Sequence, residues 1–257
     1  MTDIRRIDFL GLPLDTGITA SDVCALLRYK AGPRLITFIN PSAWALARKF
    51  PHFVDQLRSM SLVLPDGEGV ALACRMLTKL DCPRLSFDTS SLAGPFFAAA
   101  AAEQASVMLV GSQPGVDEDV HRKLASAYPN LRILETLHGF ADFAPKIARV
   151  MAVAPDVVVV GMGSPRQEEF LIALRDAGYQ GLAITCGGFF DQYLESDQYY
   201  PQWVDRLNLR FAWRLYKEPQ RLWRRYLIDY WFFIAKLVKE IYDRCLLTLR
   251  ASKSNGK

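Results

Sequence analysis

One short stretch of the chain combines an aspartate, two glycines and a proline in a way that suits an active-site loop. Asp66 lies between Pro65 and Gly67, follows the apolar run 62–64, and is followed by Gly69. The apolar run is typical of a buried strand, and the glycines allow the backbone to approach a ligand closely before a helix begins. Ligands of open α/β sheets bind at the carboxyl ends of strands. Asp66 is therefore a candidate active-site carboxylate, although an aspartate here could equally cap the next helix.

Two further glycine turns also follow apolar runs. Gly161 and Gly163 begin a run that resembles a dinucleotide-binding fingerprint, except that its sixth position is Arg166 instead of glycine. Gly111 begins a similar turn one unit earlier. Such turns offer free N–H groups to a phosphate, but they can also be plain tight turns. Gln167, in the first turn of the helix that follows, could donate a hydrogen bond to a sugar hydroxyl or a uracil edge, cap the helix, or face water.

The segments around these turns alternate between strand-like and helix-like patterns. After a small hairpin at 7–14, we expect strands at 34–39, 62–64, 107–110, 131–134, 157–160 and 182–185. We expect helices from the capping box of Thr19 and Asp22 to residue 30, at 42–50, from Pro51 to Met60, and at 68–77, 92–105, 116–128, 144–154 and 166–177. Continuous β-branched strands that alternate with helices predict an α/β fold, a Rossmann-like, largely parallel sheet with helices on both faces.

Composition places the chain among ordinary globular proteins, because 51% of its 257 residues are apolar and 23% are charged. Its five cysteines include no C-x-x-C pair and its three histidines lie far apart, so neither a disulfide framework nor a standard zinc site is indicated. Asp81, Asp88 and Asp191 stand singly, and we predict no metal and no cofactor. The first residues do not form a signal-peptide pattern, so we expect a cytoplasmic protein.

Basic charge is concentrated at the end of the chain. Residues 201–257 contain 13 Lys/Arg and 5 Asp/Glu, a net charge of +8, whereas residues 1–200 have a net charge of −4. From Pro219 onward, apolar side chains recur every three or four residues, which is typical of an amphipathic helix. Charged residues interrupt every window long enough to cross a bilayer, so we expect this element to lie on an anionic membrane surface.

Two alternatives for this basic segment stay open, namely packing on its own domain and contact within a homo-oligomer. Nucleic acid, another common partner of basic segments, is not predicted. The shift in charge and pattern divides the chain into a core, 1–200, and a helical C-terminal appendage, 201–257.

Several motifs along the chain carry a family resemblance. They are Thr37-Phe38-Ile39-Asn40-Pro41, Leu64-Pro65-Asp66-Gly67, Arg84, Leu109-Val110-Gly111, the run 160–168, Cys186-Gly187-Gly188, Arg214-Leu215 and the run 218–226. In this order they resemble the WecG/TagA/CpsF family, glycosyltransferase family 26, over nearly the whole chain. The resemblance implies transfer of a sugar from a UDP donor to a polyprenyl-diphosphate-linked sugar at the cytoplasmic membrane face. It also implies inversion at the sugar and no metal.

The resemblance implies roles for individual residues as well. Asp66 matches the family's proposed general base. The substrate-binding residues we expect are Asn40, Arg84, Gln167 and the tail residues Arg214, Arg221 and Arg224, together with Gly111, Gly163 and Thr37. Arginine suits a departing diphosphate because its planar fork binds phosphate oxygens bidentately.

The chain departs from the family pattern near the expected site. Phe38 stands where better-studied branches have threonine, and Phe87 stands where many relatives have glycine. Both positions bear on the donor sugar and the acceptor. Two other functions remain open, an NAD(P)-dependent oxidoreductase and a non-catalytic, membrane-bound nucleotide-sugar-binding protein. The missing third glycine of the fingerprint disfavours the oxidoreductase.

Overall fold

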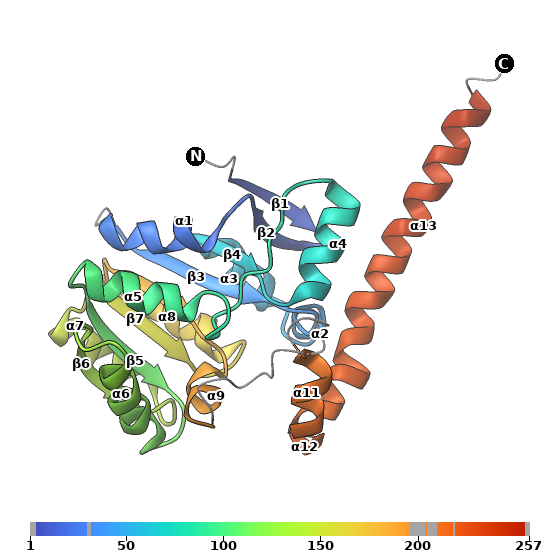
Figure 1. Cartoon of the computed structure of the whole chain (residues 1–257). Coiled ribbons are helices and arrows are strands. Elements are labelled where there is room, and N and C mark those ends of the chain that lie inside the picture. Colours follow the sequence, from blue (N-terminus) through green and yellow to red (C-terminus); the bar gives the residue numbers. More distant parts are fainter. Residues whose placement is uncertain (1–3, 30–31, 196–203, 205–209, 218, 255–257) are drawn as a thin grey trace.

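The computed structural model describes residues 4–29, 32–195, 204, 210–217 and 219–254. Its centre is a six-stranded parallel sheet with the strand order β4-β3-β8-β7-β5-β6 (Figure 1). The strands are β3 (Arg34–Ile39), β4 (Leu62–Pro65), β5 (Ser106–Gly111), β6 (Arg132–Leu137), β7 (Val157–Gly161) and β8 (Leu182–Thr185). The predicted Rossmann-like sheet is therefore confirmed, and each predicted core strand is present.

Helices cover both faces of this sheet. They are α1 (Ala20–Ala25), α2 (Ala43–Lys49), α3 (His52–Ser59), α4 (Glu68–Thr78), α5 (Ala93–Ala102), α6 (Val116–Ala127), α7 (Phe143–Val153), α8 (Arg166–Asp176) and α9 (Phe189–Glu195). The predicted capping box of Thr19 and Asp22 is present, but α1 ends at Ala25 and continues as a 3₁₀ turn, η1 (Leu26–Arg28). The sequence patterns did not predict α9.

The two layers of the core explain why the strands are so uniformly apolar. Val158 and Val160 of β7 pack into one hydrophobic cluster, and Val157 and Val159 pack into the other. Successive side chains of a strand point to opposite faces, so a strand covered on both sides needs apolar residues at every position. At the β4 edge of the sheet, the predicted hairpin forms from β1 (Arg5–Phe9) and β2 (Leu12–Thr16), where the Asp15 carboxylate accepts the Val63 N–H at 2.6 Å.

The C-terminal segment is helical and packs partly on the core. It comprises α11 (Arg210–Lys217), α12 (Pro219–Arg224), a π-helical turn η2 (Arg225–Asp229) and α13 (Tyr230–Ser254). Phe233 is 5% exposed and lies 4.7 Å from Trp44 of α2, measured between ring centroids. The far end of α13 extends away from the core (Figure 1). Within the described residues, no helix is long and apolar enough to span a membrane.

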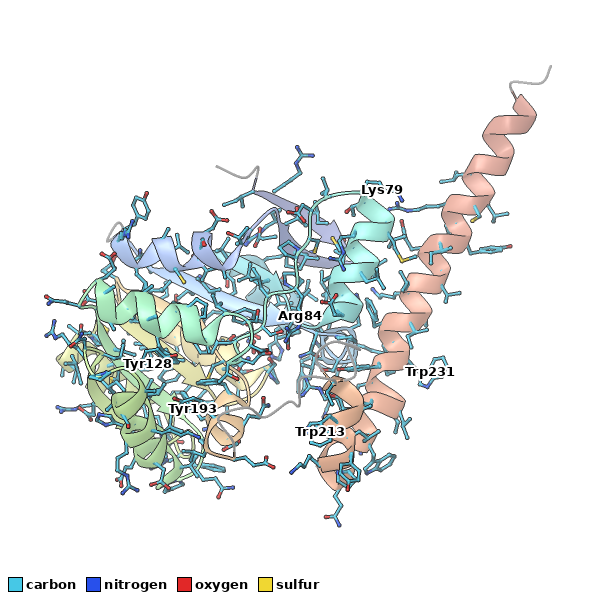
Figure 2. All side chains as sticks on the ribbon, viewed as in Figure 1. Lys79, Arg84, Tyr128, Tyr193, Trp213 and Trp231 are labelled. Atoms are coloured by element: carbon cyan, nitrogen blue, oxygen red, sulfur yellow. The ribbon has the colours of Figure 1, made fainter. Side chains whose placement is uncertain are left out.

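The contact of Phe233 with Trp44 predicts a measurable contribution to stability. Phe233→Ala should lower the free energy of unfolding by about 3 kcal/mol, because it removes a buried ring and leaves a cavity. Trp231→Ala is the matched control, since Trp231 is 62% exposed and projects away from the core (Figure 2). Its effect should stay within about 0.5 kcal/mol. Chemical denaturation measures both, and equal effects of the two changes would show that α13 is not docked at Phe233.

Candidate active site

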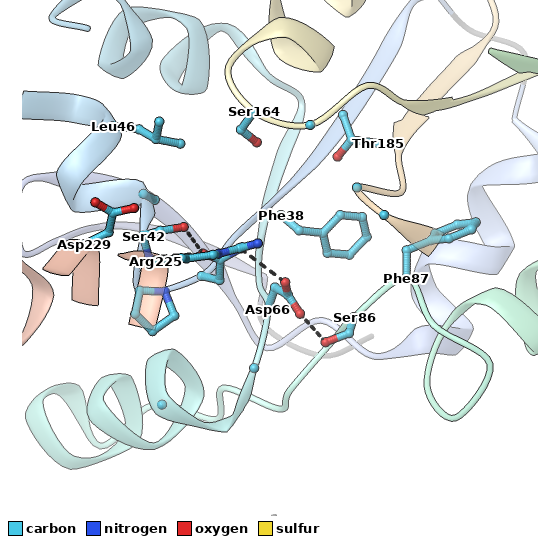
Figure 3. Close-up of a pocket in the computed structure, with 18 of the residues that line it drawn as sticks. Phe38, Ser42, Leu46, Asp66, Ser86, Phe87, Ser164, Thr185, Arg225 and Asp229 are labelled. Atoms are coloured by element: carbon cyan, nitrogen blue, oxygen red, sulfur yellow. Dashed lines mark hydrogen bonds between the residues drawn. The ribbon is translucent and has the colours of Figure 1, made fainter. Parts of the chain in front are cut away.

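A cavity of about 750 Å³ opens at the carboxyl ends of β4, β3, β8 and β7 and is bordered by the C-terminal segment (Figure 3). In the sheet, β3 lies between β4, the next strand in the sequence, and β8, which comes much later in the sequence. The strand order therefore reverses direction at β3. Open α/β sheets bind ligands at such a point. Asn40, Asp66, Arg84, Gly163 and Gln167, five of the residues singled out from the sequence, line this cavity.

Asp66 follows β4 directly and is held by three neighbours from two other segments. Its N–H donates to Ile39 O at 2.8 Å, the Ser86 hydroxyl donates to its Oδ1, and Asn40 Nδ2 lies 3.4 Å from its Oδ2 (Figure 3). The N-cap of α4 is Gly67, at a φ of 87° that favours glycine, and no side chain caps this helix end. Capping is therefore not the role of Asp66, and its carboxylate is available at the cavity.

Asn40 is itself fixed by its neighbour Ser42. The N–H and the hydroxyl of Ser42 donate to Asn40 Oδ1 at 3.1 and 2.6 Å. With its carbonyl oxygen bound in this way, the amide presents its amino group to Asp66. Two uncharged donors, from Asn40 and Ser86, thus orient the Asp66 carboxylate without neutralising it.

Arg84 lies on the loop that follows α4 and forms an ion pair with Asp88. Their side chains are only 16% and 15% exposed, so the pair is well shielded and holds the guanidinium in place. A guanidinium has five N–H donors, and one carboxylate leaves several of them for a ligand. Arg84 can therefore contribute positive charge to the cavity, as the sequence suggests.

The β7–α8 turn contributes Gly163 and Gln167 to the cavity. Gln167 is 4% exposed, and its Nε2 donates to Ser164 Oγ at 3.1 Å and to Glu168 Oε1 at 3.0 Å. It neither caps α8 nor faces water, because α8 has no side-chain cap. Gly111 is not among the residues that line the cavity. A Cβ there would lie 2.3 Å from Gly161 O, so close packing of two turns explains this glycine.

Two residues of β3 have different positions relative to the cavity. Thr37 is fully buried, donates to Glu168 Oε1 at 2.7 Å, and is not among the lining residues. Phe38 lines the cavity, and its ring centroid lies 6.4 Å from that of Phe87, which also lines it. Phe38 and Phe87, the two residues that depart from the family pattern, therefore form one aromatic wall of the cavity next to Ser86.

The C-terminal segment supplies a further wall, which includes Arg225, Tyr226 and Asp229 of η2. Arg225 Nε is buried and has no hydrogen-bond partner in the described part of the chain. Sequence reasoning missed Arg225 and instead selected Arg224, which is exposed and is not a lining residue. The side chains of Arg214 and Arg221 lie outside the described residues. The only sequence signal that could have indicated Arg225 was its position directly after Arg224.

The chemistry of the cavity fits polar group transfer. Among the described residues, no three His, Cys, Asp or Glu side chains are grouped as a metal site would need. Cys186 lines the cavity, but burial, together with the nearby Asp191, raises the pKa of its thiol well above the usual value. This thiol stays protonated and is a poor nucleophile. The charged residues that line the cavity are Asp66, Glu68, Asp88, Asp229, Arg84 and Arg225. Glu68 and Asp88 form ion pairs with Arg75 and Arg84, and Asp229 belongs to the C-terminal wall. We therefore consider Asp66 and the two arginines as the groups that a reaction could use.

Comparison with known proteins gives consistent matches along the chain. A protein of Bacillus subtilis (strain 168) named N-acetylglucosaminyldiphosphoundecaprenol N-acetyl-beta-D-mannosaminyltransferase is 32% identical over 195 residues, 75% of each chain. A protein of Shigella boydii named UDP-Gal:alpha-D-GlcNAc-diphosphoundecaprenol beta-1,4-galactosyltransferase is 26% identical over 224 residues, 85% of this chain and 92% of that one. The family model described as glycosyl transferase WecG/TagA/CpsF family matches residues 7–245. The chain therefore belongs to the WecG/TagA/CpsF family of glycosyltransferases.

Proposed function

We propose that the protein transfers a hexose or N-acetylhexosamine from a UDP donor to a polyprenyl-diphosphate-linked sugar in cell-surface or exopolysaccharide assembly. The observation that carries this proposal is the position of Asp66, a carboxylate oriented by neutral donors in a cavity that also contains two arginines. The names of both relatives support a lipid-linked acceptor, because each name includes N-acetylglucosamine linked to diphosphoundecaprenol. The name of the Shigella protein also supports a UDP-linked donor.

The proposed reaction is a single displacement with inversion at the donor sugar. Asp66 accepts the proton of the attacking acceptor hydroxyl, and the oxygen forms its bond to the anomeric carbon as the bond to UDP breaks. Asn40 and Ser86 hold the carboxylate for this step. Arg84 and Arg225 stabilise the negative charge that develops on the departing diphosphate.

Arginines would then replace the divalent cation that many diphosphate sites use, so transfer should be independent of metal. We expect full activity in excess EDTA, with no further gain on addition of Mg²⁺ or Mn²⁺, measured as sugar transfer by the purified full chain. A reproducible loss in EDTA that Mg²⁺ or Mn²⁺ restores would contradict this proposal.

We further propose that residues 201–257 form an appendage that attaches the core, 1–200, to the cytoplasmic face of the membrane. Exposed aromatic and aliphatic side chains recur along α13, including Trp231, Val238, Tyr242 and Leu247. Lys239 and Arg244 are exposed on the same helix. Apolar side chains at headgroup depth and basic groups near anionic lipid together give reversible attachment.

Ligand binding separates this function from the two alternatives left open by the sequence. A thermal-shift screen should show stabilisation by UDP and none by NAD, whereas the reverse would favour the oxidoreductase. A non-catalytic nucleotide-sugar-binding protein would also be stabilised by UDP. It would form no product with any UDP-sugar and a polyprenyl-diphosphate-linked N-acetylglucosamine.

A further inference from the structure

A buried carboxylate lies next to the cavity and has no part in the mechanism above. Glu168, in the first turn of α8, is fully buried. Its Oε1 accepts hydrogen bonds from Thr37 Oγ1 at 2.7 Å, Ser164 Oγ at 2.9 Å and Gln167 Nε2 at 3.0 Å. Thr37 Oγ1 also lies 3.0 Å from Thr185 Oγ1. Glu168 Oε1 thus joins β3 to the β7–α8 turn, and Thr37 extends this network to β8. Ser164, Gln167 and Thr185 all line the cavity.

The other carboxylate oxygen shows which protonation state this arrangement favours. Glu168 Oε2 is buried without a hydrogen-bond partner, and in the described part of the chain no basic side chain forms an ion pair with Glu168. A buried charge without a compensating cation is strongly unfavourable. Burial also raises the pKa of Glu168, against the smaller, opposite effect of its hydrogen bonds. A neutral carboxylic acid avoids this charge, and its Oε1 can still accept the hydrogen bonds of Thr37, Ser164 and Gln167.

This network determines what Gln167 can offer to a substrate. Its amino group donates to both Ser164 Oγ and Glu168 Oε1. Its carbonyl oxygen, Oε1, has no hydrogen-bond partner. An amide fixed in this way has a carbonyl oxygen left unpaired, which can accept a hydrogen bond. The sequence predicts that Gln167 donates to a sugar hydroxyl or to uracil, and the unpaired oxygen adds an acceptor to what this side chain can offer.

We propose that Glu168, in its neutral form, is a positioning residue that fixes the Gln167 amide to accept a hydrogen bond from an O–H or N–H group of the substrate. The proposal rests on the proposed glycosyl transfer and deepens it. A sugar hydroxyl and the imide N–H of uracil share this donor chemistry. Glu168 itself touches no substrate and acts through Gln167.

Four variants test the positioning role. Glu168→Ala should raise the KM of the substrate that Gln167 contacts about tenfold with a smaller change in kcat, because the amide is no longer fixed for that one hydrogen bond. Glu168→Gln should stay within about twofold of wild type, since it keeps a neutral acceptor at Oε1. Gln167→Ala should match Glu168→Ala, and the double variant should be no worse than Gln167→Ala alone. The control is Glu169→Ala, because Glu169 lies on the same turn but pairs with His52 near the surface.

Binding measurements distinguish the two sources of the donor group. Weaker binding of UDP itself by Glu168→Ala indicates the uracil imide. An unchanged affinity for UDP, with a raised KM for the UDP-sugar or for the acceptor, indicates a sugar hydroxyl.

An infrared difference spectrum, wild type minus Glu168→Gln at neutral pH, tests the protonation state without any need for activity. It should contain the C=O stretch of a protonated carboxylic acid. Three results would overturn the proposal. They are the absence of this band, equal changes in KM and kcat for Glu168→Gln and Glu168→Ala, and additive effects of Glu168→Ala and Gln167→Ala. If the wild-type protein transfers no sugar, the proposed function fails separately, while the infrared band and UDP binding still test Glu168.

Discussion

Replacing Asp66 with asparagine should reduce kcat by a factor of about 10² or more, because the attacking hydroxyl loses the group that accepts its proton. Asparagine has nearly the same shape and can still contact Ser86 and Asn40, so fold and donor binding should be nearly unchanged. The measurements are steady-state transfer, UDP binding by calorimetry, and thermal unfolding. Near-normal turnover in the variant would remove Asp66 from the mechanism.

A matched control and a second variant sharpen this test. Asp55→Asn makes the same chemical change at an exposed surface position on α3 and should leave turnover unchanged. Ser86→Ala removes one donor to the Asp66 carboxylate and leaves the base in place. Ser86→Ala should therefore lower kcat by a smaller factor than Asp66→Asn does. Its affinity for UDP should be unchanged.

Truncation of the chain before Arg210 should abolish sugar transfer, because it removes the wall that Arg225, Tyr226 and Asp229 contribute to the cavity. It should also abolish binding to vesicles that contain anionic lipid, since most of the basic charge is lost. A short, water-soluble acceptor analogue separates the two effects because it needs no membrane. Full activity of the truncated protein on this analogue would show that the segment is only an anchor.

A point variant guards against unfolding, since truncation also removes the buried Phe233. Arg225→Ala should lower transfer about 10²-fold, the size expected for losing one donor to a charge that develops in the transition state. Arg224→Ala is the neighbouring comparison, and its side chain is exposed. If Arg224→Ala is the more damaging change on the soluble analogue, the original prediction for Arg224 holds and the assignment of Arg225 is wrong. Vesicle binding should be nearly unchanged in both, because one charge among many contributes little.

The sequence was most informative where one physical effect dominates. Strands β3 and β8 have the predicted limits, because apolar runs buried on both faces leave little choice of conformation. The ends of the helices were less predictable, as the early end of α1 shows. For Asp66 the local sequence fitted a cap and an active-site carboxylate equally well. The structure excludes the cap, because Gly67 is the N-cap of α4 and no side chain caps it. The contacts that orient the carboxylate come from Asn40 and Ser86, which are distant in sequence.

Other features depend on tertiary structure that no local pattern contains. Glu168 resembles an ordinary acidic residue in the first turn of a helix, where the helix dipole favours negative charge, yet it is fully buried. Arg225 lines the cavity from within the π-helical turn, which changes the helical register of the C-terminal segment after Arg224. The roles of Arg214 and Arg221 and the division of the chain at residue 200 stay predictions.

The most direct test of the proposed function is a transfer assay with the purified full chain, a panel of UDP-sugars and polyprenyl-diphosphate-linked N-acetylglucosamine in vesicles or detergent. The product would be identified by mass spectrometry, and the anomeric configuration of the new linkage by NMR. We predict that at least one UDP-sugar yields a lipid-linked disaccharide with inverted configuration, and that Asp66→Asn forms it at least about 10²-fold more slowly. Absence of product with every UDP-sugar, in a protein that binds UDP and is folded, would contradict the account.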